Sequence, residues 1–204
     1  AQSGQDGRPG SRRRTLYAAL DLGTNNCRLL VAEPVRRGFR IVDAFSRIVR
    51  LGEGLTHTGA LSDAAQARAM EALSACAEKI GRRKVDRVRC IATQACRIAS
   101  NGADFLTRVH QRTGLRLEVI SPREEARLAV AGCAQLIDPA AKAALVVDIG
   151  GGSTELSWLA GGAPRWGARH IAAWTSLPFG VVTLAERFPE PDSGDLWTWY
   201  DDMV

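Results

Sequence analysis

Two stretches of the chain, AALDLGTNNCRLL at residues 18–30 and LVVDIGGGSTELS at residues 145–157, follow one pattern. In each, an apolar run ends in Asp, a turn of small residues follows, and a second apolar run leaves, which is typical of two strands joined by a tight turn. Alignment of the two superposes Asp21 on Asp148, Gly23 on Gly150, Asn26 on Ser153 and Leu29 on Leu156. An internal repeat of this kind predicts two similar structural units in one chain.

The rest of the chain alternates between strand and helix patterns, which predicts an α/β protein. Ser62 is a good N-cap for a helix with one apolar face, and Gly81 suits its C-terminal end. The predicted strands cover residues 17–21, 27–33, 39–49, 85–93, 115–120, 145–149, 154–159 and 165–172, and the predicted helices cover residues 62–81, 105–112 and 122–136.

Composition favours a folded protein of the cytoplasm. The 204 residues are 46% hydrophobic, enough for one or two ordinary cores. No apolar run is long enough for a membrane span, and the start of the sequence lacks the apolar segment of a secretion signal. The five cysteines form no CxxC pair, so we expect neither a disulfide framework nor a zinc site.

The chain is basic, with a net charge of +5 and a pI near 9.3, which favours an anionic partner. Part of the excess lies in residues 1–15, where Arg8, Arg12, Arg13 and Arg14 occur among Gly, Ser and Gln, and we expect a disordered basic arm there. No aromatic residues alternate with these arginines and no nucleic-acid module surrounds them, so we expect no specific nucleic-acid binding.

The two turns have the chemistry of phosphate-binding loops. Small residues let successive backbone N–H groups converge on phosphate oxygens. An Asp at the end of the preceding strand repels phosphate and is better suited to hold a metal ion or the attacking water. The chain contains neither GxxxxGK[ST] nor GxGxxG, so the P-loop and Rossmann alternatives lose their main support. The predicted phosphate ligands are Gly23, Thr24, Asn25 and Asn26 in the first turn and Gly150, Gly151, Gly152 and Ser153 in the second.

Six collinear motifs resemble the exopolyphosphatase/guanosine pentaphosphatase family. They are DLGTNNCRLL at 21–30, RLGEGL at 50–55, IATQACRIASNG at 91–102, ISPREEARLAVAG at 120–132, VVDIGGGSTEL at 146–156 and SLPFGVVTL at 176–184. The resemblance implies two actin-like, ribonuclease H-like domains, with polyphosphate or guanosine pentaphosphate bound between them. It also implies hydrolysis of the terminal phosphoanhydride with Mg²⁺.

Family members continue past the point at which this sequence stops. We therefore expect the first actin-like domain at residues 16–121, and a linking helix with an incomplete second domain at residues 122–204. A partial sheet leaves an open edge, so we expect the region after Ala172 to be mobile or packed against another copy in a homodimer. For the same reason, this polypeptide alone is expected to turn over substrate slowly or not at all.

The sequence and the resemblance together select catalytic side chains. In Ser121-Pro122-Arg123-Glu124, Glu124 completes a capping box and is assigned a structural role. Glu125 matches the family's general base, which activates the attacking water. Arg97 matches an arginine on a substrate phosphate, whereas Arg28 is either a further phosphate ligand or an exposed strand residue. Asp148 and Glu155 match carboxylates that hold the metal or the water, although Glu155 could instead be a cross-strand partner.

Two alternatives to an oligophosphate hydrolase stay open. Actin-like ATPases and small-molecule kinases share the fold and the paired loops, and a fold alone does not choose between such functions. The third hypothesis is a noncatalytic sensor that binds polyphosphate or the alarmone guanosine pentaphosphate without turnover. The sequence does not distinguish polyphosphate from guanosine pentaphosphate as the preferred substrate.

Overall fold

The computed structural model describes residues 14–36, 38–161, 166–191 and 196–203. The arm predicted at residues 1–15 therefore lies almost entirely outside the described residues. We keep the predicted division after Ser121 and refer to residues 14–121 as the first lobe and residues 122–203 as the second lobe. Within the described residues, no helix is both long and apolar enough to cross a membrane.

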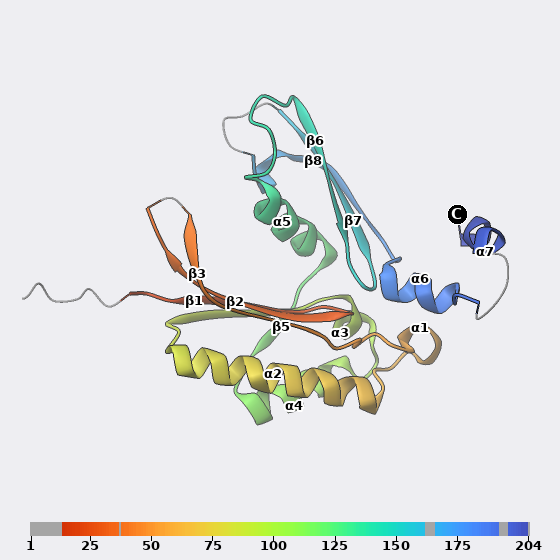
Figure 1. Cartoon of the computed structure of the whole chain (residues 1–204), viewed down its shortest axis with the longest axis horizontal. Coiled ribbons are helices and arrows are strands. Elements are labelled where there is room, and N and C mark those ends of the chain that lie inside the picture. The colour runs from red at the N-terminus through yellow and green to blue at the C-terminus, as the bar shows by residue number, and fades with distance from the viewer. Residues whose placement is uncertain (1–13, 37, 162–165, 192–195, 204) are drawn as a thin grey trace, which may run out of the picture.

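The first lobe contains a five-stranded sheet in the order β3-β2-β1-β4-β5. The first three strands pair antiparallel, whereas β1 with β4 and β4 with β5 pair parallel. Helices α2 and α4 cover one face of this sheet (Figure 1). The elements are β1 (Tyr17–Leu22), β2 (Asn26–Pro34), β3 (Phe39–Ile48), α1 (Leu55–Thr58), α2 (Asp63–Arg83), β4 (Arg87–Ala92), α3 (Gln94–Ile98), α4 (Gly102–Thr113) and β5 (Leu117–Val119).

Alternating side chains of β1 and β2 form the core of the first lobe because successive residues of a strand point to opposite faces. Ala18, Leu20 and Leu22 of β1 are buried with Cys27, Leu29 and Val31 of β2, against Ala69, Leu73 and Cys76 of α2 and Phe105 and Val109 of α4. The other residues of β1, among them Asp21, face away from this core. The strands that lead into and out of the β1–β2 turn are thus packed on the core through one face.

The second lobe is smaller and has a three-stranded antiparallel sheet in the order β6-β7-β8. Helix α5 packs against all three strands, and Val130 of α5 is buried with Val146, Leu159 and Trp166. Figure 1 shows α5 rising from the first sheet toward the second. The elements are α5 (Pro122–Cys133), β6 (Ala143–Ile149), β7 (Thr154–Ala160), the 3₁₀ turn η1 (Ala168–His170), β8 (Ile171–Leu177), α6 (Val181–Arg187) and α7 (Leu196–Met203).

The predicted repeat is confirmed residue by residue. Asp21 pairs with Arg28 across β1 and β2, and Asp148 pairs with Glu155 at the equivalent position of β6 and β7. The turns also match, since the Gly23 N–H donates to the Asn26 carbonyl at 2.8 Å and the Gly150 N–H donates to the Ser153 carbonyl at 2.9 Å. The same hairpin is built twice.

Some details of the predicted elements were wrong, among them the end of α5, which lies at Cys133 and not at Leu136. Helix α2 does not end at Gly81 but continues to Arg83, and Lys84 ends it with a φ of 51°, although Ser62 is its N-cap as predicted. In the described part of the strand predicted at 165–172, β8 begins only at Ile171 and then runs on to Leu177. Short helices α1 and α3 were not predicted, because isolated helices of four or five residues carry no periodic signal.

The region after Ala172 contacts the same chain in its described part. Strand β8 pairs with β7, and α6 bonds through its first turn to the β6–β7 loop. A homodimer stays a prediction.

Candidate active site

The loops of the two repeated hairpins lie against each other. A Cβ added to Gly151 would lie 2.9 Å from the Asn25 nitrogen and 3.0 Å from the Thr24 Cβ. A Cβ added to Gly152 would lie 2.8 Å from the Thr24 hydroxyl oxygen and 3.0 Å from a side-chain carbon of Gln94. The glycines are therefore needed here for close approach, and the two lobes meet at the two predicted phosphate loops.

Helix α6 holds the second loop in place. The Val181 N–H donates to the Gly150 carbonyl at 3.0 Å, and the Val182 N–H donates to the Gly151 carbonyl at 2.8 Å. A Cβ on Gly180 would lie 2.5 Å from the Gly150 oxygen, so this approach also needs glycine. These bonds fix the loop's carbonyls on the α6 side.

A carboxylate of α6 forms a second connection between the lobes. Glu186 accepts hydrogen bonds from the Gly54 N–H, at 2.6 Å, and from the Thr56 hydroxyl. Gly54 and Thr56 belong to the segment that contains α1 in the first lobe (Figure 1). This contact lies outside the loops and holds the same two lobes together.

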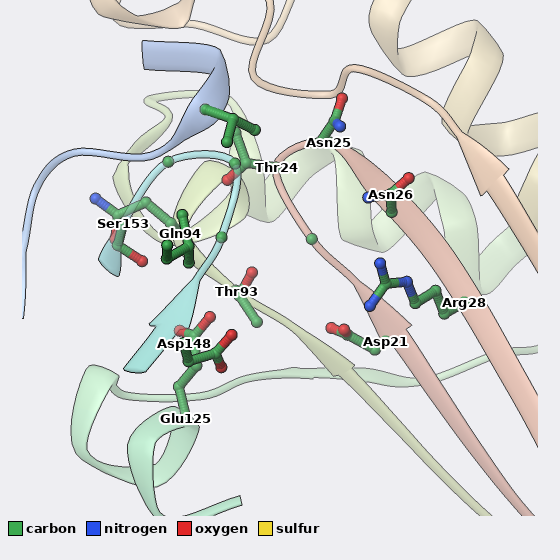
Figure 2. A pocket seen from close by; sticks show the side chains of 16 residues that line it. Asp21, Thr24, Asn25, Asn26, Arg28, Thr93, Gln94, Glu125, Asp148 and Ser153 are labelled. Carbon is green, nitrogen blue, oxygen red and sulfur yellow. The ribbon is translucent and has the colours of Figure 1, made fainter. Parts of the chain in front are cut away.

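A cavity of about 150 Å³ lies where the two loops meet. It is lined by residues of both loops, by three carboxylates and by one arginine. Figure 2 shows Glu125 and Asp148 on one side, Asp21 and Arg28 on the other, and Thr93 between them. Its lining comprises Asp21, Gly23, Thr24, Asn25, Asn26, Arg28, Thr93, Gln94, Glu125, Asp148, Ile149, Gly150, Gly151, Gly152, Ser153 and Val181.

Glu125 lies in the first turn of α5, which Ser121 caps through a hydrogen bond from the Glu124 N–H at 3.2 Å. The Glu125 side chain is only 18% exposed. Burial, and then the nearby Glu155 carboxylate, raise the pKa of Glu125 to about 7, against the opposing effect of Arg97. A carboxylate with this pKa can take a proton from water near neutral pH.

The adjacent Glu124 is in a different environment. Its carboxylate accepts from Arg127 at 2.6 and 2.8 Å and from Arg89 at 3.2 Å. These hydrogen bonds, above all those of Arg127, lower the pKa of Glu124 to about 2. The predicted capping box is only half formed, because the carboxylate binds charged guanidinium groups instead of the Ser121 N–H.

Asp21 and Asp148, the paired acids of the repeat, both line the cavity. Burial raises the pKa of Asp21, Arg28 opposes this effect, and the negative charge of Asp148 adds to it. The Asp21 Oδ1 atom is buried and has no hydrogen-bond partner. A buried carboxylate oxygen without a donor is suited to a cation or to a ligand's proton.

The structure brings all the predicted site residues to the cavity lining except Arg97 and Glu155. Glu155 is 2% exposed and accepts a hydrogen bond from the Ser176 hydroxyl at 2.7 Å, which is the arrangement of a cross-strand partner. Arg97 donates to the Ile120 carbonyl and to the Gln94 side chain, both at 2.6 Å, and to Glu125. In this conformation Arg97 therefore contacts the acid and not the cavity.

Five lining residues were absent from the predicted set of site residues: Asp21, Thr93, Gln94, Ile149 and Val181. Asp21 was noted as the partner of Asp148 in the repeat but was not selected. Thr93 and Gln94 lie inside the IATQACRIASNG motif, next to Arg97, and the order of the motif was the available signal.

Comparison with known proteins identifies the family. The model of the Ppx/GppA phosphatase family matches residues 30–195. The chain belongs to this family. The crystal structure of the Aquifex aeolicus Ppx/GppA family member is 33% identical, with a TM-score of 0.69 over 87% of this chain and 56% of that one. An exopolyphosphatase from Cytophaga hutchinsonii is 25% identical, with a TM-score of 0.78 over 93% of this chain and 60% of that one.

This Ppx/GppA chain has the actin-like two-domain fold with an incomplete second domain, and it spans less than two thirds of the length of these two relatives. The fold extends further, since a chain of the PilM–PilN type IV pilus biogenesis complex matches with a TM-score of 0.51 at 14% identity. That likeness concerns the fold alone.

Proposed function

We propose that this Ppx/GppA chain carries the catalytic groups of a hydrolase that removes the terminal phosphoryl group from a phosphoanhydride chain, either inorganic polyphosphate or guanosine pentaphosphate. The observation that carries the proposal is that one cavity is lined by both glycine- and asparagine-rich loops and by Glu125. Phosphoryl transfer needs mainly positioned donors and a positioned nucleophile, and this arrangement supplies both.

Glu125 acts as the general base in the proposed reaction. It takes a proton from a water molecule as the water oxygen bonds to the terminal phosphorus. The bond from that phosphorus to the bridging oxygen breaks, and the shortened chain leaves with the electron pair. The proton then passes from Glu125 to the released phosphate or to solvent, which restores the carboxylate.

The two loops bind the phosphate oxygens. The proposed donors are backbone N–H groups of the two loops other than those of Gly23 and Gly150, and the side chains of Asn25, Asn26 and Ser153. Arg28 supplies a positive charge next to Asp21. The cavity volume corresponds to about five water molecules. It thus has room for the end of a phosphate chain.

Mg²⁺ is the proposed cofactor, and Asp21 and Asp148 are the residues that would hold it. The unpartnered Asp21 Oδ1 fits this role. The described residues contain no group of three or more His, Cys, Asp or Glu side chains suited to a metal ion. A site with two carboxylates suits Mg²⁺, because this ion is commonly held by one or two carboxylates plus substrate phosphates. When bound, the ion would offset negative charge on the phosphates. The buried Glu155 would have an indirect role, since its negative charge raises the pKa of Glu125.

The test is phosphate release from long-chain polyphosphate, guanosine pentaphosphate and ATP, each with and without Mg²⁺. This chain is measured beside a version extended to the length of its relatives, with Glu125→Gln as the inactive control. Release that requires Mg²⁺ and is lost in Glu125→Gln supports the proposal. Substrate binding without release in both versions indicates a sensor, and release from ATP alone indicates an actin-like ATPase.

A further inference from the structure

Thr93 turns its hydroxyl toward the cavity, where the hydroxyl has no hydrogen-bond partner among the described residues (Figure 2). The residue is 6% exposed and lines the cavity between β4 and α3. It occupies the N-cap position of α3, yet its side chain makes no capping hydrogen bond. A threonine hydroxyl that faces a cavity and has no partner in the protein is available to a ligand bound there.

The backbone of Thr93 is fixed from both sides. Its N–H donates to the Leu22 carbonyl at the end of β1, at 3.1 Å, and its carbonyl accepts from the Arg97 N–H, also at 3.1 Å. The hydroxyl oxygen lies 4.0 Å from the position of a Cβ on Gly23, which places it beside the first phosphate loop. Figure 2 shows it in the middle of the cavity, between Asp148 and Asp21.

The Thr93 hydroxyl lies in a cavity that three acids also line. Asp21, Asp148 and Glu125 can only accept hydrogen bonds when they are ionised, so none of them can donate to a negatively charged phosphoryl oxygen. A hydroxyl donates one hydrogen bond and accepts others. Thr93 is thus a neutral donor and acceptor placed among acids.

We infer that Thr93 is a catalytic residue: its hydroxyl donates to an oxygen of the terminal phosphoryl group and accepts a hydrogen bond from the attacking water, whose other hydrogen points to Glu125. This inference rests on the proposed function. The hydroxyl keeps its own proton throughout, since Glu125 takes the proton from the water. Thr93 thereby lines up the water oxygen with the phosphorus and stabilises charge on the phosphoryl group.

The experiment uses the version extended to the length of its relatives and compares wild type, Thr93→Val, Thr93→Ser and Glu125→Gln in magnesium-dependent phosphate release from polyphosphate. Valine keeps the shape of threonine without the hydroxyl, and serine keeps the hydroxyl. We expect kcat to fall about 10- to 100-fold in Thr93→Val, KM to change less than about threefold, and Thr93→Ser to recover most of the rate. Thr107→Val is the matched control, because its hydroxyl bonds only to the Ala103 carbonyl within α4.

The outcomes separate the two proposals. An active wild type with an unchanged kcat in Thr93→Val overturns the role of Thr93 and leaves the hydrolase intact. A wild type that releases no phosphate from any substrate overturns both. Thermal unfolding of each variant distinguishes lost chemistry from lost folding, and a Thr93→Ser variant that folds but stays as slow as Thr93→Val also overturns the inference.

Discussion

Arg97 and Glu125 are joined across the two lobes: both terminal nitrogens of the guanidinium donate to Glu125 Oε2, at 3.3 and 3.4 Å. Arg97 lies on α3 of the first lobe and Glu125 on α5 of the second lobe. Both side chains are 18% exposed, so water screens the pair only in part. The arginine thus fixes the direction of the proposed base.

Arg97→Lys should lower kcat by about tenfold or more, although it keeps the charge. An ammonium group cannot reproduce the planar fork that reaches Ile120, Gln94 and Glu125 together. Arg127→Lys, which alters the arginine beside Glu124, is the matched control and should leave the rate nearly unchanged. Steady-state kinetics on both variants measure the effect, and an unchanged kcat/KM in Arg97→Lys would place Arg97 outside the catalytic arrangement.

Glu125→Gln should reduce kcat by about 10²- to 10⁴-fold while substrate binding stays roughly intact, because the base is lost without a change in size. Glu124→Gln should keep most of the activity, since Glu124 contacts Arg89 and Arg127 outside the cavity. The measurement is single-turnover phosphate release with a separate binding titration. The reverse order of effects would exchange the two roles.

The pH profile should show the titration of Glu125. Only the carboxylate form can accept a proton, so kcat/KM should rise with pH and level off above the pKa of about 7. Arg97 lowers this pKa, and Arg97→Ala should therefore move the midpoint to higher pH. Glu124→Gln provides the comparison profile, because it leaves Glu125 in place. Coinciding midpoints in Arg97→Ala and wild type would contradict the assignment.

Glu125→Gln should also stabilise the fold, but only at higher pH. Because folding raises the pKa of Glu125 from 4.5 to about 7, folding favours the protonated form. The resulting stability is fully present below pH 4.5 and is lost as the pH rises through 7. Glutamine has no charge to bury, so the variant should gain on the order of 1–3 kcal/mol at pH 8 and little at pH 4.5. Urea unfolding at both values tests this, and an equal gain at the two would argue against a buried charge.

Gly151→Ala should separate the loops, since the added methyl group would lie 2.9 Å from the Asn25 nitrogen. We expect a loss of at least about 10²-fold in kcat/KM, because both loops must bind one phosphate group. Gly81→Ala is the control: it lies inside α2 with nothing within 4 Å of the new methyl, and it should stabilise the helix by about 0.5–1 kcal/mol. Full activity in Gly151→Ala would show that loop contact is dispensable.

The sequence predicted what local pattern and repetition determine. The hairpins around Asp21 and Asp148, and the helix that begins after Ser121, all lie where the residues indicated. The end of α2 was misjudged because Gly81 has a good terminal signal, but the chain continues helically until Lys84 adopts the left-handed conformation.

The sequence could not predict contacts that depend on how the lobes meet. Arg97 and Glu125 are 28 positions apart in the sequence. They lie on two helices, and no local sequence pattern predicts how these helices are placed relative to each other. The resemblance implied that Arg97 binds a substrate phosphate, and in the structure Arg97 donates to Glu125, the proposed base. Thr93 was missed for a related reason, since an unbonded hydroxyl can be recognised only when all its neighbours are known.

The contact between the loops has a consequence for how such a chain can change over time. Gly151 and Gly152 come from one copy of the duplicated hairpin, and Thr24 and Asn25 come from the other. A larger side chain in either copy needs a smaller one opposite, so the two copies are no longer free to drift separately. The two repeated loops thus form one steric unit, in which substitutions are expected to arrive as compensating pairs.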